Sequence, residues 1–324
     1  MEINNSMPKM ITDPEGSIRT EQFSEKRNAR YAKPRKGTSL NEFMARFPDS
    51  DACLAHVFSR NHDEFSPCPK CGRRTRWFRI RGLKRYSSNC CGGNSIHPLS
   101  RTMFARSSIS LHTWFYAILH FCNTSTGISA ETLSIQLGIS HDAAYRMGKR
   151  IRMHLAALDS DWTIGAPGQV VYVYEDRLVN IQSLNGGTRD PLRIVALYDG
   201  KVTAVIPIAK GRFAASNKAI LRRVHSEALL EFKSAETLRK MSQHRRWLKA
   251  EQCQWRVSDP YRDLQLGPIT SMLSALKIFI LRNHLWVRED QISYYIAHFE
   301  FLYRRRKLGK SVFEDAISHF PDID

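Results

Sequence analysis

A Gly-Ala-Pro-Gly stretch at residues 165–168 divides this chain of 324 residues into two halves with different hydrophobic patterns. Glycine and proline interrupt regular secondary structure, so this stretch predicts a boundary between domains. Before it, apolar residues recur mostly at helical spacing, and after it short runs typical of strands alternate with helical segments. The order after the boundary predicts strands near residues 169–175, 178–183 and 191–198, an extension at 201–208, a helix near 214–225 and a strand at 227–232.

Three further helices are expected beyond the last of these strands, one near residues 234–249 and two in the runs 267–283 and 289–307. Together the patterns predict an α+β or α/β protein of several domains, in which helices flank a mixed sheet. The last helix ends in a run of basic residues, which complements the helix dipole and suits phosphate groups. We therefore expect nucleic-acid contacts from Arg304, Arg305 and Arg306.

The chain carries 49 lysines and arginines against 31 aspartates and glutamates, a formal net charge of +18. An excess of this size favours a polyanionic partner, and we expect double-stranded DNA. The sequence has no run of about 18 apolar residues and no apolar signal-peptide core, so no membrane partner is expected. We expect a cytoplasmic, nucleoid-associated protein. Residues 1–37 are basic and poor in apolar side chains, which predicts a disordered tail.

Helical patterns fill two stretches of the first half. Within residues 38–62, apolar residues at helical spacing lie on either side of Pro48 and predict two short helices. Within residues 109–160, Ser129 and Ser140 suit the N-caps of successive helices, and Gly138 suits the tight turn between them. This arrangement predicts a helix-turn-helix whose second helix enters a major groove. The outer positions of that helix, which include our candidate DNA contacts, hold His141, Asp142, Tyr145, Arg146, Lys149, Arg150 and Arg152.

A cysteine motif marks residues 63–108 as a zinc-ribbon-like segment. Cys68 and Cys71 stand in a Cys-x-x-Cys-Gly knuckle, where the glycine lets thiolates and backbone amides face one cation. Cys91, which a glycine follows, fits the second half of a later knuckle, but the residue three positions earlier is Ser88, a poor zinc ligand. Adjacent cysteines do not readily share one tetrahedral ion, and a zinc-free ribbon held by packing is the alternative. The remaining candidates for the fourth ligand are Cys90 and His97.

In this order, the motifs resemble those of a family of bacterial insertion-sequence transposases with a zinc ribbon, a helix-turn-helix and an RNase H-like DDE domain. The resemblance runs from Ser39 to Lys307. It is carried by the stretches FPDSDAC, CPKCG, TMFARSSISLHTWFYAI and GISAETLSIQLGISHDAAYRMGKRIR, and by a late pattern from SALK to FEFLYRRR. It implies an RNase H-like domain at residues 168–310, followed by a tail at 311–324, and a site that holds two divalent ions.

The chain departs from this family at each of the three positions where the resemblance implies a metal ligand. Tyr174 stands on the first strand, Phe232 after the fourth strand and Thr270 on the late helix. None of these side chains is a good Mg²⁺ ligand, because hard cations prefer negatively charged oxygen. We therefore expect no catalytic magnesium and no strand-cleaving enzyme. Neighbouring acids that would serve a shifted site are Asp176, Glu231, and Asp259 or Asp263.

The leading hypothesis is a catalytically inactive DNA-binding protein derived from such a transposase, with a regulatory or architectural role. Two alternatives stay open. One is an active DDE transposase with a shifted metal site, and the other is a protein-interaction subunit of a nucleic-acid assembly. A homodimer and a larger protein complex are both open as states of the protein, since no sequence pattern marks an interface.

Overall fold

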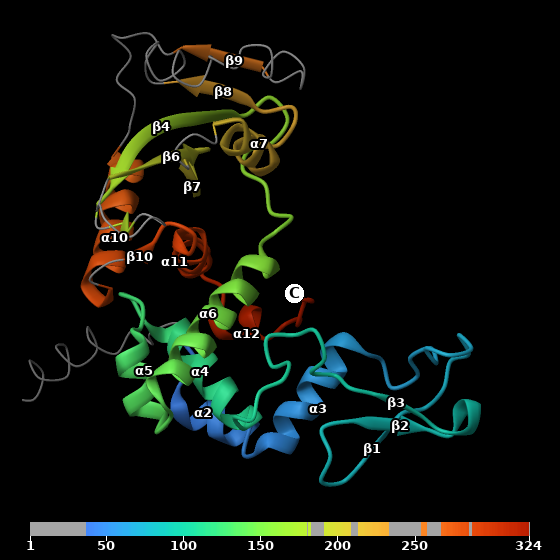
Figure 1. Ribbon diagram of the computed structural model, residues 1–324. Helices are drawn as coiled ribbons and strands as arrows, with labels where there is room; N and C mark the ends of the chain where they lie inside the picture. Colours follow the sequence, from blue (N-terminus) through green and yellow to red (C-terminus); the bar gives the residue numbers. More distant parts are fainter. Residues whose placement is uncertain are drawn as a thin grey trace, which may run out of the picture. The chain divides into compact units, whose positions relative to one another are not determined.

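The computed structural model describes residues 37–179, 181–182, 191–208, 213–232, 254–257, 267–284 and 287–323. Residues Gly37–Asp324 form one compact unit. This unit combines helices with a five-stranded mixed sheet and a small antiparallel sheet, which confirms the predicted α+β class (Figure 1). Most of the predicted basic tail and the predicted helix near 234–249 lie outside the described residues.

The two short helices predicted around Pro48 are present, and their first turns show why they begin where they do. The Ser39 hydroxyl accepts a hydrogen bond from the Glu42 amide, and the Glu42 carboxylate accepts one from the Ser39 amide. Such a capping box satisfies two backbone donors that a helix start leaves free. The Asp49 carboxylate caps the second helix. These helices pack with an apolar helix and a C-terminal helix; the four are α2 (Leu40–Arg46), α3 (Ser50–Asn61), α4 (Leu111–Asn123) and α12 (Val312–Ala316).

The segment that holds the cysteine motif forms a small three-stranded antiparallel sheet. It is attached to α3 by an aromatic stack and an ion pair. The rings of Phe58 and Tyr86 are stacked with centroids 3.8 Å apart, and the Arg79 guanidinium lies 2.6 Å from the Asp51 carboxylate. The strands are β1 (Phe78–Arg79), β2 (Tyr86–Ser88) and β3 (Asn94–Ile96), and a short 3-10 turn, η1 (Cys90–Gly92), precedes β3.

The two helices predicted on either side of Gly138 are α5 (Ala130–Leu137) and α6 (His141–Leu158). The hydroxyls of Ser129 and Ser140 accept hydrogen bonds from the third amide of each helix. Gly138 has φ +62, a left-handed conformation that glycine adopts without a Cβ clash. The residues that face the core from these helices are Leu133, Ala144, Met147, Ile151 and Leu155.

Beyond the Gly-Ala-Pro-Gly stretch, five strands form a mixed sheet in the order β7-β6-β4-β8-β9. Strand β6 pairs antiparallel with both β4 and β7. Strand β8 pairs in parallel with β4, and β9 pairs in parallel with β8. Parallel pairing needs a crossover, and helix α7 (Phe213–Arg223) supplies it between β7 and β8. The strands are β4 (Val170–Leu178), β6 (Leu192–Tyr198), β7 (Thr203–Ile208), β8 (Leu229–Phe232) and β9 (Gln254–Val257).

Side chains of the sheet alternate between two hydrophobic cores, because successive strand residues point to opposite faces. Val171 and Val173 of β4 join the core that contains the α7 residue Ile220. Tyr172 and Tyr174 instead pack against the core that contains the last long helices. Figure 1 shows those helices on one side of the sheet; they are α10 (Gly267–Asn283) and α11 (Ile292–Lys307).

The structure corrects one predicted strand boundary. Residues 169–175 and 178–183 were expected as separate strands, whereas β4 runs without a break from Val170 to Leu178. Asp176 and Arg177, which fall between the two expected strands, lie within β4 and pair with β6. The short strand β5 (Ile181–Gln182) does not join the main sheet and pairs in parallel with β10 (Val287–Arg288), which the sequence did not predict.

Buried ion pairs connect the end of α6 to α11, and a hydrogen bond connects it to α7. The carboxylate of Asp159, which is 7% exposed, accepts hydrogen bonds from Arg304 and Arg305 of α11. Arg223 of α7 donates to the main-chain carbonyl of Asp159 at 2.7 Å. The Arg304 guanidinium also lies 3.8 Å from the ring centroid of Trp162. The C-terminal end of α6 is therefore fixed against the helices α7 and α11.

Candidate metal centre and nucleic-acid interface

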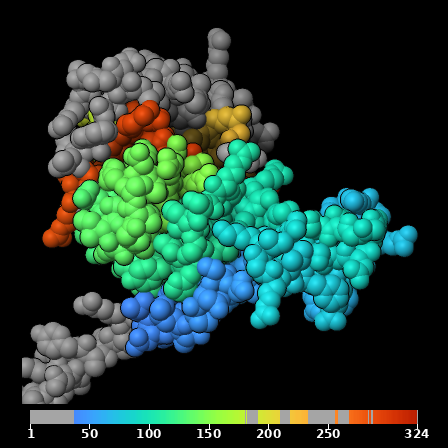
Figure 2. Space-filling model, turned by 60° about the horizontal axis from the view of Figure 1, so that its bottom comes forward, coloured from blue at the N-terminus to red at the C-terminus, as the bar shows by residue number. Residues whose placement is uncertain are grey.

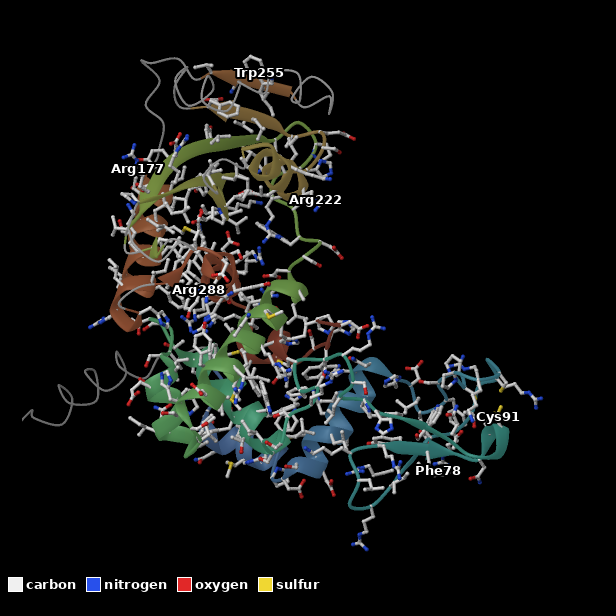
Figure 3. All side chains as sticks on the ribbon, in the orientation of Figure 1. Phe78, Cys91, Arg177, Arg222, Trp255 and Arg288 are labelled. Atoms are coloured by element: carbon white, nitrogen blue, oxygen red, sulfur yellow. The ribbon has the colours of Figure 1, made fainter. Side chains whose placement is uncertain are left out.

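Four thiols of the small sheet converge on one point. The Sγ atoms of Cys68, Cys71, Cys90 and Cys91 all lie within 4.8 Å of one another. The separations are 3.9 Å for Cys68 and Cys91, 3.4 Å for Cys71 and Cys90, and 3.7 Å for Cys90 and Cys91. A tetrahedral zinc ion with Zn–S bonds of about 2.3 Å requires sulfur separations of about 3.8 Å. The donor set and its spacing therefore fit zinc, and Figure 3 labels Cys91 beside this cluster.

The expectation that adjacent cysteines do not readily share one ion is corrected by the backbone of η1. Within this turn Cys91 has φ 56 and ψ 40, a left-handed conformation that brings its thiol to the same point as that of Cys90. Ser88, at the expected ligand position, supports the turn instead, because its hydroxyl accepts a hydrogen bond from the Cys90 amide at 3.3 Å. His97 is exposed and does not belong to the cluster of metal-ligating side chains found in the described residues.

Backbone amides of the first knuckle stabilise the thiolate form of its cysteines. The Cys71 amide donates to the Cys68 sulfur and is the main cause that lowers the Cys68 pKa to about 6. The Arg73 amide lowers the pKa of Cys71 in the same way. The Asn94 side chain adds a third donor to the Cys68 sulfur at 3.3 Å. Thiolate is the form that binds zinc, and four protein thiolates leave no open position for a substrate, so the cluster suits a structural ion.

Two of the three positions where the resemblance implies catalytic ligands face opposite sides of the sheet. Tyr174 on β4 faces the helices α10 and α11, whereas Phe232 on β8 is fully buried against the opposite core. The register explains this, because Phe232 pairs with Val173, which faces away from the side of Tyr174. Thr270 is exposed on α10, and its hydroxyl donates to the Gly267 carbonyl at 3.1 Å.

The acids proposed for a shifted site each have a basic partner where the structure describes them. Asp176 lies on the same face of β4 as Tyr174, and the Lys277 ammonium of α10 lies 2.6 Å from its carboxylate. Glu231, which is 1% exposed, accepts a hydrogen bond from the Arg256 Nε at 2.6 Å. Asp263 and Asp259 lie outside the described residues.

The sheet register also separates these two acids. Glu231 pairs with Tyr172, and Asp176 stands four residues further along β4. At about 3.3 Å per residue this spacing amounts to about 13 Å along the strand. The metal ions of a two-metal site lie only about 3.5–4 Å apart. Asp176 and Glu231 are therefore too far apart along the strands to share one ion.

Two further acids beyond the Gly-Ala-Pro-Gly stretch also have basic partners. Glu175 of β4 forms an ion pair with Arg193 of β6 at 2.6 Å. Glu300 of α11 accepts a hydrogen bond from the Val205 amide and lies 3.5 Å from Arg223. Burial raises the pKa of Glu300 to about 7, because the loss of hydration outweighs the attraction of Arg223.

Sequence reasoning missed these basic partners, although one of them left a visible signal. Lys277 is the only charged residue between Gly267 and Leu281, in a stretch that otherwise reads as an uncharged, mostly buried helix. A single lysine on such a helix indicates a specific partner, because an unpaired ammonium is costly to bury. Nothing in the sequence connects Arg256 with Glu231, since the strand β9 that carries Arg256 was not predicted.

The outer side of α6 presents most of the predicted DNA contacts to solvent. His141, Asp142, Tyr145 and Arg146 are exposed or half-buried in its first two turns. Lys149 is half-buried and no side-chain partner is found for it in the described part of the chain. Figure 2 shows the green segment that contains α4 to α6 uncovered on one face of the molecule.

Several predicted phosphate contacts are instead engaged inside the protein. Arg304 and Arg305 are held by Asp159, and Arg306 donates to the main-chain carbonyls of Cys122 and Thr124. Since α11 packs against α6 and β7, its basic end faces the protein interior. On α6 itself, Arg150 donates to the Ala105 carbonyl at 2.6 Å, and Arg152, expected on the outer positions, is only 5% exposed.

Further basic side chains lie beside α6 and in the segment of the small antiparallel sheet, which we call the ribbon. A cavity of about 290 Å³ next to α6 is lined by Arg106, Arg146 and Arg150, which can approach a phosphate together. On the ribbon, the Arg76 guanidinium lies 5.5 Å from the ring centroid of Phe78, and that ring is 49% exposed (Figure 3). Among the described residues, no helix is both long enough and apolar enough to cross a bilayer.

Comparison with known proteins adds little to this description. No protein-family profile matches the sequence, and no curated protein matches it. Among solved structures, one similar chain belongs to the "Crystal structure of a pre-cleavage Mos1 transpososome". The two chains are 12% identical, with a TM-score of 0.22, and the alignment covers 62% of this chain and 78% of that chain. A similarity at this level establishes neither a shared fold nor a shared function.

Proposed function

We propose that this protein binds double-stranded DNA through the α5–α6 pair and the cysteine-bearing ribbon, and that its sheet half does not cut or join strands. The net charge of +18 supports a polyanionic partner. The first two turns of α6 offer exposed polar and basic side chains of the kind that contact base edges. The motif resemblance to insertion-sequence transposases supports an origin from such an enzyme, and a regulatory or architectural role follows from binding without chemistry.

The observation that carries the non-catalytic part is the ion pair between Lys277 and Asp176. Lys277 comes from α10, the helix on which the resemblance implies a metal ligand. Its ammonium supplies a positive charge to the acid that stands two residues from Tyr174 on the same strand face. A carboxylate neutralised in this way is a weak ligand for a second cation, because the bound ammonium must first be displaced. Within the described residues, the metal chemistry of strand transfer therefore lacks free, converging carboxylates.

DNA binding is tested by selecting bound duplexes from a random pool and measuring their affinity at several salt concentrations. We expect Arg146→Ala to weaken binding to a selected site by about 1–3 kcal/mol and to relax sequence preference. Arg146→Lys keeps the charge but loses the paired donors of the guanidinium, so it separates base reading from phosphate attraction. Lys310→Ala, which removes an exposed charge beyond α11, serves as the control. Equal losses in the alanine variants at both positions would rule out α6 as the reading helix.

Strand chemistry is tested with the selected duplex in the presence of Mg²⁺ or Mn²⁺. We expect no cleavage and no strand joining above background. Metal-dependent cleavage that disappears in Asp176→Ala would overturn the non-catalytic proposal and establish a shifted active site. Cleavage that persists in Asp176→Ala would point to a contaminating nuclease, and a repeat with independently purified protein separates the two cases.

A further inference from the structure

A buried arginine, for which no acidic partner is found among the described residues, lies where α6, β10 and α11 meet. The side chain of Arg152 is only 5% exposed, and no ion pair to it is found within the described residues. One Nη atom donates to the Ile128 carbonyl at 3.2 Å, while its Nε atom has no partner there. The guanidinium is stacked 4.0 Å from the ring centroid of Tyr295 and 5.2 Å from that of Phe121.

The neighbouring imidazoles do not supply the missing negative charge. An imidazole ring carries either no charge or a positive charge. Burial lowers the pKa of His284 to about 3 and that of His298 to about 3, which favours the uncharged form. The acid beside the Arg288 side chain, Asp290, is already paired with it at 3.0 Å. A buried cation without a counter-charge is costly unless a bound anion compensates it. Arg152 thus points to an anionic ligand.

Arg152 lines two cavities that have room for such a ligand. One, of about 290 Å³, opens between α6, β10 and the first turn of α11. The other, of about 280 Å³, lies on the side of α5. Figure 3 labels Arg288, whose strand β10 borders the first cavity. The cations and aromatic rings that line this first cavity are Tyr145, Lys149, Arg152, Arg288, Tyr294 and Tyr295.

We propose that the first cavity binds a nucleotide, with its phosphate held by Lys149, Arg152 and Arg288 and its base against the tyrosine rings. Lys149 and Arg152 have no acidic partner among the described residues, and Arg288, although paired with Asp290, is half exposed and can share its guanidinium with a phosphate. Tyrosine rings suit a nucleobase, since every base offers a π-face for stacking. The source of the nucleotide is either a free nucleoside monophosphate or an unpaired nucleotide of bound DNA. The second source rests on the proposed DNA-binding function, because Tyr145 and Lys149 belong to α6 as well as to the cavity.

The first arm of the experiment titrates the full-length protein with deoxyadenosine monophosphate, inorganic phosphate and deoxyadenosine, using calorimetry. We expect the monophosphate to bind at least tenfold more tightly than either fragment alone. Arg288→Ala and Tyr294→Ala should each weaken it at least fivefold. These positions lie outside the proposed DNA-reading face, and their side chains are not part of a buried core, so the fold should survive. Lys310→Ala is the control, and thermal melting confirms that each variant is folded.

The second arm compares a fully paired duplex with one that carries a single unpaired nucleotide. If the nucleotide comes from DNA, the bulged duplex binds at least tenfold more tightly, and Arg288→Ala removes this preference without changing the affinity for the paired duplex. Binding of the monophosphate with no preference for the bulge assigns the cavity to a free nucleotide, even if duplex binding itself fails. Arg146-dependent duplex binding with neither monophosphate binding nor a bulge preference overturns the inference and leaves the proposed function intact.

Discussion

The cysteine cluster of the ribbon and the acidic side chains of the sheet are built from residue types that bind metal ions, but their surroundings differ. In the ribbon, four thiols share one point. Backbone amides favour the thiolate form of Cys68 and Cys71, while hydrogen bonding to Cys71 raises the pKa of Cys90 and Cys91. On the sheet, Asp176 and Glu231 stand apart along β4 and β8, and each is paired with a lysine or an arginine. Ligand chemistry alone therefore does not make a metal site. A metal site also requires that the ligand atoms converge on one point and that no basic side chain already occupies them.

The largest expected effect tests the ribbon side of this comparison. We expect purified protein to contain one zinc ion per chain, and Cys71→Ser to lose it. Strands β1 to β3 should then lose protection from hydrogen exchange, while α4 keeps it, because few other contacts hold the small sheet. Elemental analysis and hydrogen-exchange mass spectrometry provide the measurements. His97→Ala is the matched control, and a loss of zinc in that variant would mean that the ligand set is wrong.

The next effect concerns the most deeply buried acid of the described strands. Arg256→Met should lower the free energy of unfolding by about 3 kcal/mol, because it leaves the Glu231 carboxylate buried without its base. Chemical denaturation measures this loss. Adding Glu231→Gln should recover most of it, because the neutral amide does not need the Arg256 guanidinium. If the single variant is as stable as the parent protein, the ion pair is not what allows Glu231 to be buried.

A third effect separates Glu300 from the other paired acids. Its folded-state pKa of about 7 lies above its ordinary value of 4.5, so the folded protein holds the proton more tightly than the unfolded chain. The stability that this contributes is present below about pH 4.5 and is lost as the pH rises through about 7. Glu300→Gln should flatten that part of the stability profile, a difference of about 3 kcal/mol between the two ends. Parallel profiles for the two proteins would show that Glu300 titrates normally.

The smallest effect is expected at Lys277. Its ion pair with Asp176 is partly exposed, so Lys277→Met should lower the free energy of unfolding by only about 1 kcal/mol. Removal of the ammonium should not create a manganese site, because no second acid lies near Asp176 on the same face of the described strands. Electron paramagnetic resonance of added Mn²⁺ checks this. Tight Mn²⁺ binding by the variant would mean that the lysine alone blocks a complete set of ligands.

Local patterns allowed much of the fold to be predicted from the sequence. Serine caps, the glycine turn and apolar spacing marked α5 and α6, and the β-rich runs marked most strands of the sheet. Pairing over long separations was beyond reach: β10 is only two residues long, and the four residues of β9 lack the apolar run that marked the equally short β8. The burial of Arg304 and Arg152 could not be predicted for the same reason, because it depends on which helices pack against them.

The ion pairs of Asp159 with Arg304 and Arg305 fix one end of α6 to α11. The helix has 18 residues and is therefore about 27 Å long. Its first two turns carry the side chains proposed to contact DNA, and its far end is bound by two arginines of α11, which packs against the edge strand β7. If α6 binds DNA as proposed, a torque applied there by a bent or twisted duplex would pass through these ion pairs to α11 and the sheet.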